Sequence, residues 1–156
     1  MTLLMEYEKA TRQAELARLR RVLAVRAMLL EGESQRDIAV RFGFTQPAIS
    51  YQVSRERTDG VRPSELIAAG KGVLRHVAEA RGFADLAVFG SVARGEDQPN
   101  SDLDFLVQPP NDADLFDLQR LEDTFEAIIG RKVDVVSYRG LDPRLDSDIL
   151  REKVLL

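Results

Sequence analysis

Residues 86–107 combine two short apolar runs with a glycine turn and a polar spacer, and this order restricts the fold more than any other stretch. The first run ends at Gly90 and Ser91, and the second contains Asp102 and Asp104. Side chains two positions apart in a strand point to the same face of a sheet. The pattern therefore predicts two strands, the second of which presents both carboxylates together while its apolar residues face a core.

The residue types in this segment favour phosphate chemistry. Two carboxylates held side by side repel each other unless a cation lies between them, and hard oxygen ligands suit Mg²⁺. The backbone amides of Gly90 and Ser91 and the serine hydroxyl suit a phosphate. The combination predicts phosphoryl or nucleotidyl transfer. The alternative is that Asp102 and Asp104 belong to a solvated turn or strand edge.

A third acid extends the pattern. Residues 131–136 form a β-branched run with Asp134 in its middle, a position where aspartate is disfavoured without a specific role. If this strand lies beside the one that carries Asp102 and Asp104, the three carboxylates form a cluster. The alternative is an edge strand with Asp134 facing water.

The spacing G-S-x(10)-D-x-D followed by a later strand aspartate resembles the minimal nucleotidyltransferases (MNT family) of the DNA polymerase β superfamily. The resemblance covers about residues 64–156, and every metal-binding position matches. It implies a small mixed-sheet domain and a two-metal mechanism with ATP as the nucleotide. In that mechanism Asp102 and Asp104 bridge two Mg²⁺ ions, and Asp134 holds the ion nearer the attacking hydroxyl. Arg94 would add positive charge at the phosphates, or would be an ordinary surface residue.

The resemblance also implies a partner. MNT proteins are commonly antitoxins encoded beside a helical HEPN ribonuclease toxin, and they are thought to inactivate it by adding AMP to a tyrosine. Two alternatives remain open: a transcriptional regulator whose second module only binds nucleotide or a partner protein, and an enzyme with a small-molecule acceptor of the aminoglycoside type. The latter is expected to need a substrate-binding helical domain after the core, for which the chain leaves no room.

The first third of the chain predicts a helical module. Residues 11–31 have helical spacing, Ser34 is expected to cap a helix over 35–42, and Gly43 is expected to turn the chain into a third helix. This run resembles the helix-turn-helix of repressors of the phage-repressor type, and the alternative is a plain helical hairpin. The resemblance implies that operator DNA is a partner. So small a module is expected to need dimerisation for tight binding, because one recognition helix makes few contacts, and the expected assembly is a homodimer or a hetero-oligomer with the toxin. The residues expected at the DNA are Thr45, Gln46, Ser50, Tyr51 and Arg55.

Charge supports two modules with different partners. The net charge is −4, yet residues 1–62 hold 11 Lys/Arg against 8 Asp/Glu, whereas residues 63–156 hold 11 against 18. The expected domains are 1–60 for DNA binding and 64–156 for nucleotidyl transfer, giving an α/β (α+β) fold class in which an all-α domain precedes a small mixed sheet. Cysteine is absent, and neither a membrane span nor a signal peptide is expected, so the cytoplasm is the default location.

The second module is expected to alternate helices and strands in the order α-β-α-β-α-β-α. A helix capped by Ser64 precedes the first strand, and a helix that starts at Asp112 or Asp114 and ends at Gly130 precedes the third. Asp142 with Pro143 is expected to open the last helix. Three strands make a thin core, so a partner or a second copy is expected to shield its flank.

Overall fold

The computed structural model describes residues 1–55, 58 and 60–156, without the side chain of Arg55, and these residues form the mixed α/β fold that was predicted. The elements are α1 (Leu3–Leu30), α2 (Gln35–Phe42), α3 (Gln46–Arg55), α4 (Pro63–Ala80), β1 (Ala84–Phe89), α5 (Ser91–Arg94), β2 (Leu103–Gln108), α6 (Leu115–Ile129), β3 (Val133–Ser137), a 3₁₀ turn (Tyr138–Gly140), α7 (Ser147–Glu152) and β4 (Val154–Leu155).

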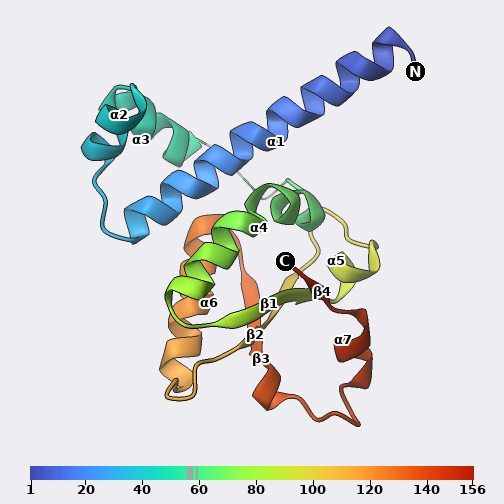
Figure 1. Ribbon diagram of the computed structural model, residues 1–156. Helices are drawn as coiled ribbons and strands as arrows, with labels where there is room; N and C mark the ends of the chain where they lie inside the picture. The colour runs from blue at the N-terminus through green and yellow to red at the C-terminus, as the bar shows by residue number, and fades with distance from the viewer. Residues whose placement is uncertain (56–57, 59) are drawn as a thin grey trace.

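The strands form one mixed sheet in the order β3-β2-β1-β4 (Figure 1). β1 pairs antiparallel with β2, and β2 pairs parallel with β3. The fourth strand, β4, was not predicted. Its two residues pair with Ala87 and Val88 of β1, so this end of the chain shields part of the flank that was expected to need a partner.

Helices α4 and α6 supply the core against one face of the sheet. Phe105 of β2 and Phe125 of α6 meet edge to face, with ring centroids 5.2 Å apart. Leu23 of α1 joins the same cluster. Helices α1 and α4 approach closely at Gly70, where a Cβ atom would lie 2.8 Å from Leu23 Cδ1 and would displace the end of that side chain. Helix α1 therefore contributes to the core of the second module, and the domain boundaries stay a prediction.

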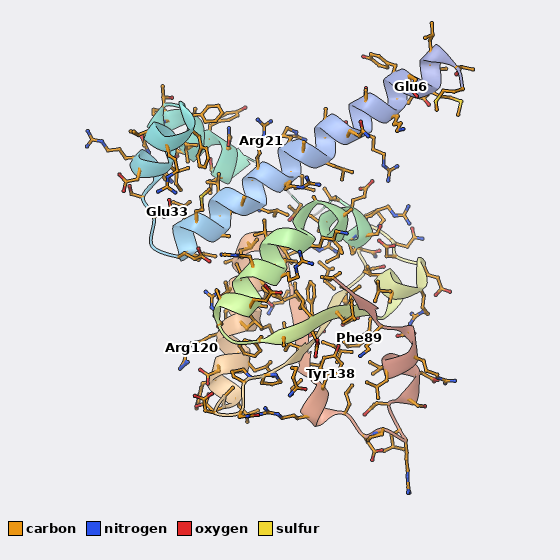
Figure 2. All side chains as sticks on the ribbon, in the orientation of Figure 1. Glu6, Arg21, Glu33, Phe89, Arg120 and Tyr138 are labelled. Carbon is orange, nitrogen blue, oxygen red and sulfur yellow. The ribbon has the colours of Figure 1, made fainter. Side chains whose placement is uncertain are left out.

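Helix α1 begins eight residues earlier than its predicted start. Thr2 caps it by accepting a hydrogen bond from the Met5 amide, and the following residues include good helix formers such as leucine, methionine, glutamate and alanine. The first half of α1 projects away from the rest of the molecule (Figure 1), and Glu6 lies near its free end (Figure 2).

The α2–α3 pair matches its predicted boundaries. The Ser34 hydroxyl accepts a hydrogen bond from the Asp37 amide, and Gly43 ends α2 in the left-handed region at φ +73°. Ile38 and Ile49 are buried together in a small cluster of their own. Phe42, the last residue of α2, is 53% exposed. None of the helices among the described residues is both long and apolar enough to cross a membrane.

Two predicted caps are wrong. Helix α4 begins at Pro63 rather than after Ser64, and the Ser64 amide instead donates to the Asp97 carboxylate at 2.9 Å. Helix α7 begins at Ser147. The Asp142 side chain accepts from the Arg144 amide at 2.8 Å and so holds a local turn, which competes with helix formation.

Candidate active site

The predicted Gly-Ser turn lies at the end of β1, beside the acidic strand. Gly90 has φ +74° and ψ −152°, a conformation that only glycine adopts readily, and Ser91 opens the single turn of α5. Phe89 is the register partner of Asp104 on β2. Gly90, which follows Phe89, is therefore next to the residue that pairs with Asp104, the predicted catalytic acid.

Asp104 and Asp134 are register partners on the parallel strands β2 and β3. Register partners project from the same face of a sheet, and Asp102 precedes β2 by one residue, on the same side as Asp104. Asp104 is half-buried, whereas Asp102 and Asp134 are exposed. Asp134 thus lies both beside Asp104 and on an outer strand open to water.

Electrostatics identify Asp104 as the centre of this group. Burial raises the pKa of its carboxyl, and the charges of Asp134 and Asp102 raise it further, while Arg94 lowers it and Glu152 raises it. Like charges therefore accumulate around Asp104 with only partial compensation. A divalent cation would remove this repulsion.

The donor chemistry fits magnesium. Asp102, Asp104 and Asp134 offer carboxylate oxygens, the ligands that Mg²⁺ prefers. As the side chains stand, no three acidic or histidine side chains of the described residues are close enough together to hold an ion. The three aspartates would therefore have to adjust their rotamers to share one.

A residue that the sequence did not predict occupies the Gly-Ser turn. The Gly90 amide donates to Glu152 Oε1 at 3.0 Å, and Arg94 Nη1 lies 3.3 Å and 3.2 Å from the two oxygens of the same carboxylate. The Ser91 hydroxyl makes no hydrogen bond among the described residues. Glu152 stands 62 positions after Gly90, and no local pattern connects the two.

Arg131 supports the loop that leads to Asp102. Its guanidinium donates to the carbonyl oxygens of Ser101 at 2.8 Å and Pro99 at 3.0 Å. It also donates to the carbonyls of Val61 at 3.0 Å and Thr58 at 3.5 Å. One side chain thus joins the loop that precedes Asp102 to the segment that precedes α4.

Asp97 fixes the other end of this loop. It is 1% exposed. Burial alone would raise the pKa of its carboxyl, but the hydrogen bonds from Ser64 and the charge of Arg62 hold it below the usual value. A charged Asp97 therefore anchors the loop to the N-terminus of α4.

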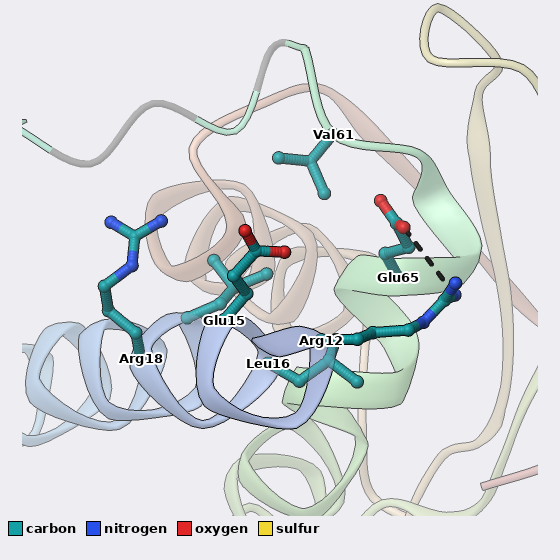
Figure 3. A pocket seen from close by; sticks show the side chains of 7 residues that line it. Arg12, Glu15, Leu16, Arg18, Val61 and Glu65 are labelled. Carbon is teal, nitrogen blue, oxygen red and sulfur yellow. Dashed lines mark ion pairs between the residues drawn. The ribbon is translucent and has the colours of Figure 1, made fainter. Parts of the chain in front are cut away.

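The hollows on the surface differ in their relation to this site. A pocket of about 260 Å³ lies beside α1 and α4, where Arg12 and Glu65 pair at 3.8 Å (Figure 3), and no predicted site residue lines it. A more open hollow of about 530 Å³ is lined by Arg94, Glu152 and two further charged residues of α7, Asp148 and Arg151. It adjoins the Gly-Ser turn and is the larger of the two spaces.

The residues predicted for DNA contact lie on or next to α3. Thr45 caps the helix by accepting from the Ala48 amide at 3.2 Å. Gln46 is exposed and donates to Gln35 at 2.7 Å. Ser50 is half-buried and Tyr51 is 60% exposed. The Arg55 side chain lies outside the described residues.

Comparison with known proteins agrees with the geometry of the second module. Residues 77–156 match the family model described as "Polymerase beta, Nucleotidyltransferase". The match begins within α4 and includes every strand of the sheet as well as the turn, the three aspartates and Glu152.

Two curated relatives are each similar to about half of this chain. "Putative protein adenylyltransferase MJ0435" of Methanocaldococcus jannaschii is 40% identical over 73 residues, which are 47% of this chain and 78% of that protein. "Protein adenylyltransferase MntA" of Thermococcus cleftensis is 36% identical over 89 residues, 57% of this chain and 87% of that protein. A solved structure described as a "putative minimal nucleotidyltransferase" is 41% identical, with a TM-score of 0.55 over 60% of this chain and 95% of that one.

Proposed function

The chain belongs to the polymerase beta nucleotidyltransferase family and is a nucleotidyltransferase, and we propose that it transfers AMP from ATP to a side chain of a protein. The observation that carries the proposal is the pairing of Asp104 with Asp134 on neighbouring strands. Asp104 also pairs with Phe89, the residue directly before the Gly-Ser turn. The names of the two curated relatives support the protein acceptor, because both are called protein adenylyltransferases.

In this proposal the three aspartates hold magnesium and the turn receives the nucleotide. Asp102, Asp104 and Asp134 supply the carboxylate ligands, and Ser91 and Arg94 bind the outer phosphates. When bound, Mg²⁺ supplies Lewis-acid charge at the reacting phosphate. The oxygen of the acceptor hydroxyl forms a bond to the α-phosphorus and gives up its proton to water. The bond from the α-phosphorus to the bridging oxygen of the β-phosphate breaks, and pyrophosphate leaves.

We further propose that the acceptor is a tyrosine of a HEPN-type toxin and that the chain is its antitoxin. The support is the resemblance of the motif to antitoxins of this type and the likeness to the Thermococcus protein named MntA. Transfer of AMP to a toxin would add a bulky anionic group at a functional tyrosine and so block its activity.

The front module is proposed to bind operator DNA as a homodimer. Helices α2 and α3 pack through Ile38 and Ile49 and are joined at the left-handed Gly43, as in a helix-turn-helix. Gln46 and Tyr51 are exposed on α3, where a recognition helix meets the major groove. Binding there would let the protein repress its own operon.

Two labelled nucleotides test the proposed transfer. The protein is incubated with Mg²⁺, a HEPN-type ribonuclease as the acceptor, and ATP labelled at either the α- or the γ-phosphate. Label is expected on the ribonuclease from α-labelled ATP alone, because the γ-phosphate leaves in pyrophosphate. Label from γ-labelled ATP would mean phosphorylation. Operator binding without any transfer would support the alternative of a regulator whose second module only binds.

A further inference from the structure

Glu152 lies where a phosphate was expected. Its Oε1 accepts the hydrogen bond of the Gly90 amide, and both of its oxygens are within 3.3 Å of Arg94 Nη1. An amide has one proton to donate, so the Gly90 amide is already used. The groups of the turn that remain for a nucleotide are those of Ser91 and the outer side of Arg94.

The backbone around Glu152 holds this carboxylate in place. Glu152 ends α7, and β4 follows two residues later and pairs with β1, with Val154 opposite Val88. The Leu156 amide then donates to the Leu86 carbonyl at 2.9 Å. The carboxylate is therefore anchored to the same strand that delivers the Gly-Ser turn, and moving it away would strain or break these strand contacts.

Arg94 ends α5, the single helical turn that follows Gly90. Gly90 in turn packs against the acidic strand, because a Cβ atom there would lie 2.5 Å from Asp104 Oδ2. Arg94 is 45% exposed and its pair with Glu152 adjoins the open hollow of about 530 Å³. Without Glu152 the long Arg94 side chain would lose a partner that limits its orientations. The nucleotide would then have to fix this side chain on binding, and the lost side-chain entropy would weaken its affinity.

We propose that Glu152 is a positioning residue of the nucleotide site: its carboxylate fixes the Gly90 amide and the Arg94 guanidinium so that Ser91 and Arg94 meet the phosphates of ATP. The inference rests on the proposed function. The opposite role is that Glu152 competes with the phosphates for the turn, and the two roles predict opposite changes in ATP affinity.

Calorimetric titration with Mg²⁺-ATP of the full chain separates these roles. We expect Glu152→Ala to weaken ATP binding about tenfold, the effect of losing a charge-assisted hydrogen bond. Glu152→Gln keeps an acceptor for the Gly90 amide but not the charge, so its loss is expected to be smaller, about threefold. Asp123→Asn is the control, because Asp123 is an exposed acid of α6 that lines neither of the two hollows and accepts a hydrogen bond from Gln119; it is expected to bind ATP as the wild type does.

A double variant distinguishes positioning from a general loss of structure. If Glu152 acts through Arg94, adding Glu152→Ala to Arg94→Ala is expected to weaken binding further by less than about threefold, since the shared contact is already lost. Full additivity would overturn the inference. In transfer assays, KM for ATP is expected to rise more than kcat falls.

Two outcomes have different consequences. ATP binding by Glu152→Ala that equals or exceeds that of the wild type would overturn the inference alone, and tighter binding would identify Glu152 as a competitor. A wild-type protein that binds no ATP would overturn the proposed function and this inference with it. If Glu152→Ala does not fold, Glu152→Gln carries the same test.

Discussion

Gly90 and Asp104 fit so closely together that a Cβ atom on residue 90 would lie 2.5 Å from Asp104 Oδ2. The glycine also has a positive φ of +74°, which side chains with a Cβ rarely adopt. The Gly-Ser turn therefore packs directly against Asp104, and this packing depends on the absence of a side chain at residue 90.

This fit predicts that Gly90→Ala is harmful to both fold and activity. The added methyl group must displace either the turn or the Asp104 carboxylate, and the backbone strain alone costs about 1–3 kcal/mol. Urea unfolding is expected to show a loss of this size, and AMP transfer is expected to fall by at least about a hundredfold.

Gly72→Ala is the control for this change. Gly72 lies within α4 with open space around its Cα, so alanine is expected to stabilise the protein by roughly 0.5–1 kcal/mol. Equal stability losses in the two variants would contradict the special role of Gly90.

The raised pKa of Asp104 predicts a dependence of stability on pH. Because burial and then the charges of Asp134 and Asp102 raise this pKa in the folded state, the fold prefers the neutral carboxyl. The resulting stabilisation is fully present below the ordinary value of about 3.9 and is lost as the pH rises through the raised value. Without metal, Asp104→Asn is therefore expected to unfold at a higher temperature than the wild type at pH 7.

The same comparison at acidic pH is the check on this reasoning. The difference between wild type and Asp104→Asn is expected to shrink below about pH 4. If, in the presence of a chelator at pH 7, the wild type is more stable than Asp104→Asn, the folded protein stabilises the charged Asp104 carboxylate, contrary to the prediction.

Arg131 is predicted to matter more for stability than its neighbour. Arg131→Ala removes donors from the carbonyls of Ser101, Pro99 and Val61, and unpaired polar groups of this kind cost roughly 1–3 kcal/mol. Lys132→Ala changes an exposed side chain and is expected to alter the free energy of unfolding by less than about 0.5 kcal/mol. Chemical denaturation of both variants measures the difference.

Operator binding is predicted to depend on α3 and not on the three aspartates of the proposed active site. Gln46→Ala is expected to weaken binding to the promoter of the protein's own operon by roughly 1–3 kcal/mol, the value of one good base contact. Asp104→Asn is expected to bind the same DNA as the wild type. A gel-shift titration at fixed salt compares them, and unchanged binding by Gln46→Ala would remove Gln46 from the proposed interface.

The central strands and their acids were predictable because their signals are local. Asp102 and Asp104 are two positions apart in an apolar run, and Asp134 interrupts a β-branched run, so alternation within a strand was enough to place each carboxylate. Which strand lay beside which depended on the family resemblance. The α2–α3 pair was predictable for the same local reason, since Ser34 and Gly43 mark its boundaries.

The features that the sequence did not predict depend on contacts between residues that are far apart in the chain. β4 has two residues, too few for any periodicity, and it forms only because β1 offers an edge at Ala87 and Val88. Glu152 resembles any other helical glutamate in the sequence, and its role depends on β4 carrying it to Gly90. Asp142 did carry a cap signal, but its side chain closed a turn on the Arg144 amide instead.

Transfer of α-labelled phosphate by Asp104→Asn tests whether the proposed acidic cluster carries out the reaction. The substitution removes the carboxylate beside Asp134 with little change in side-chain size, so the variant is expected to fold, and Asp123→Asn serves as the exposed control. With Mg²⁺, ATP and the partner protein, Asp123→Asn is expected to label the partner like the wild type, and Asp104→Asn is expected to lose at least about a thousandfold in rate. Labelling of the partner by Asp104→Asn at the wild-type rate would show that the transfer does not depend on this carboxylate.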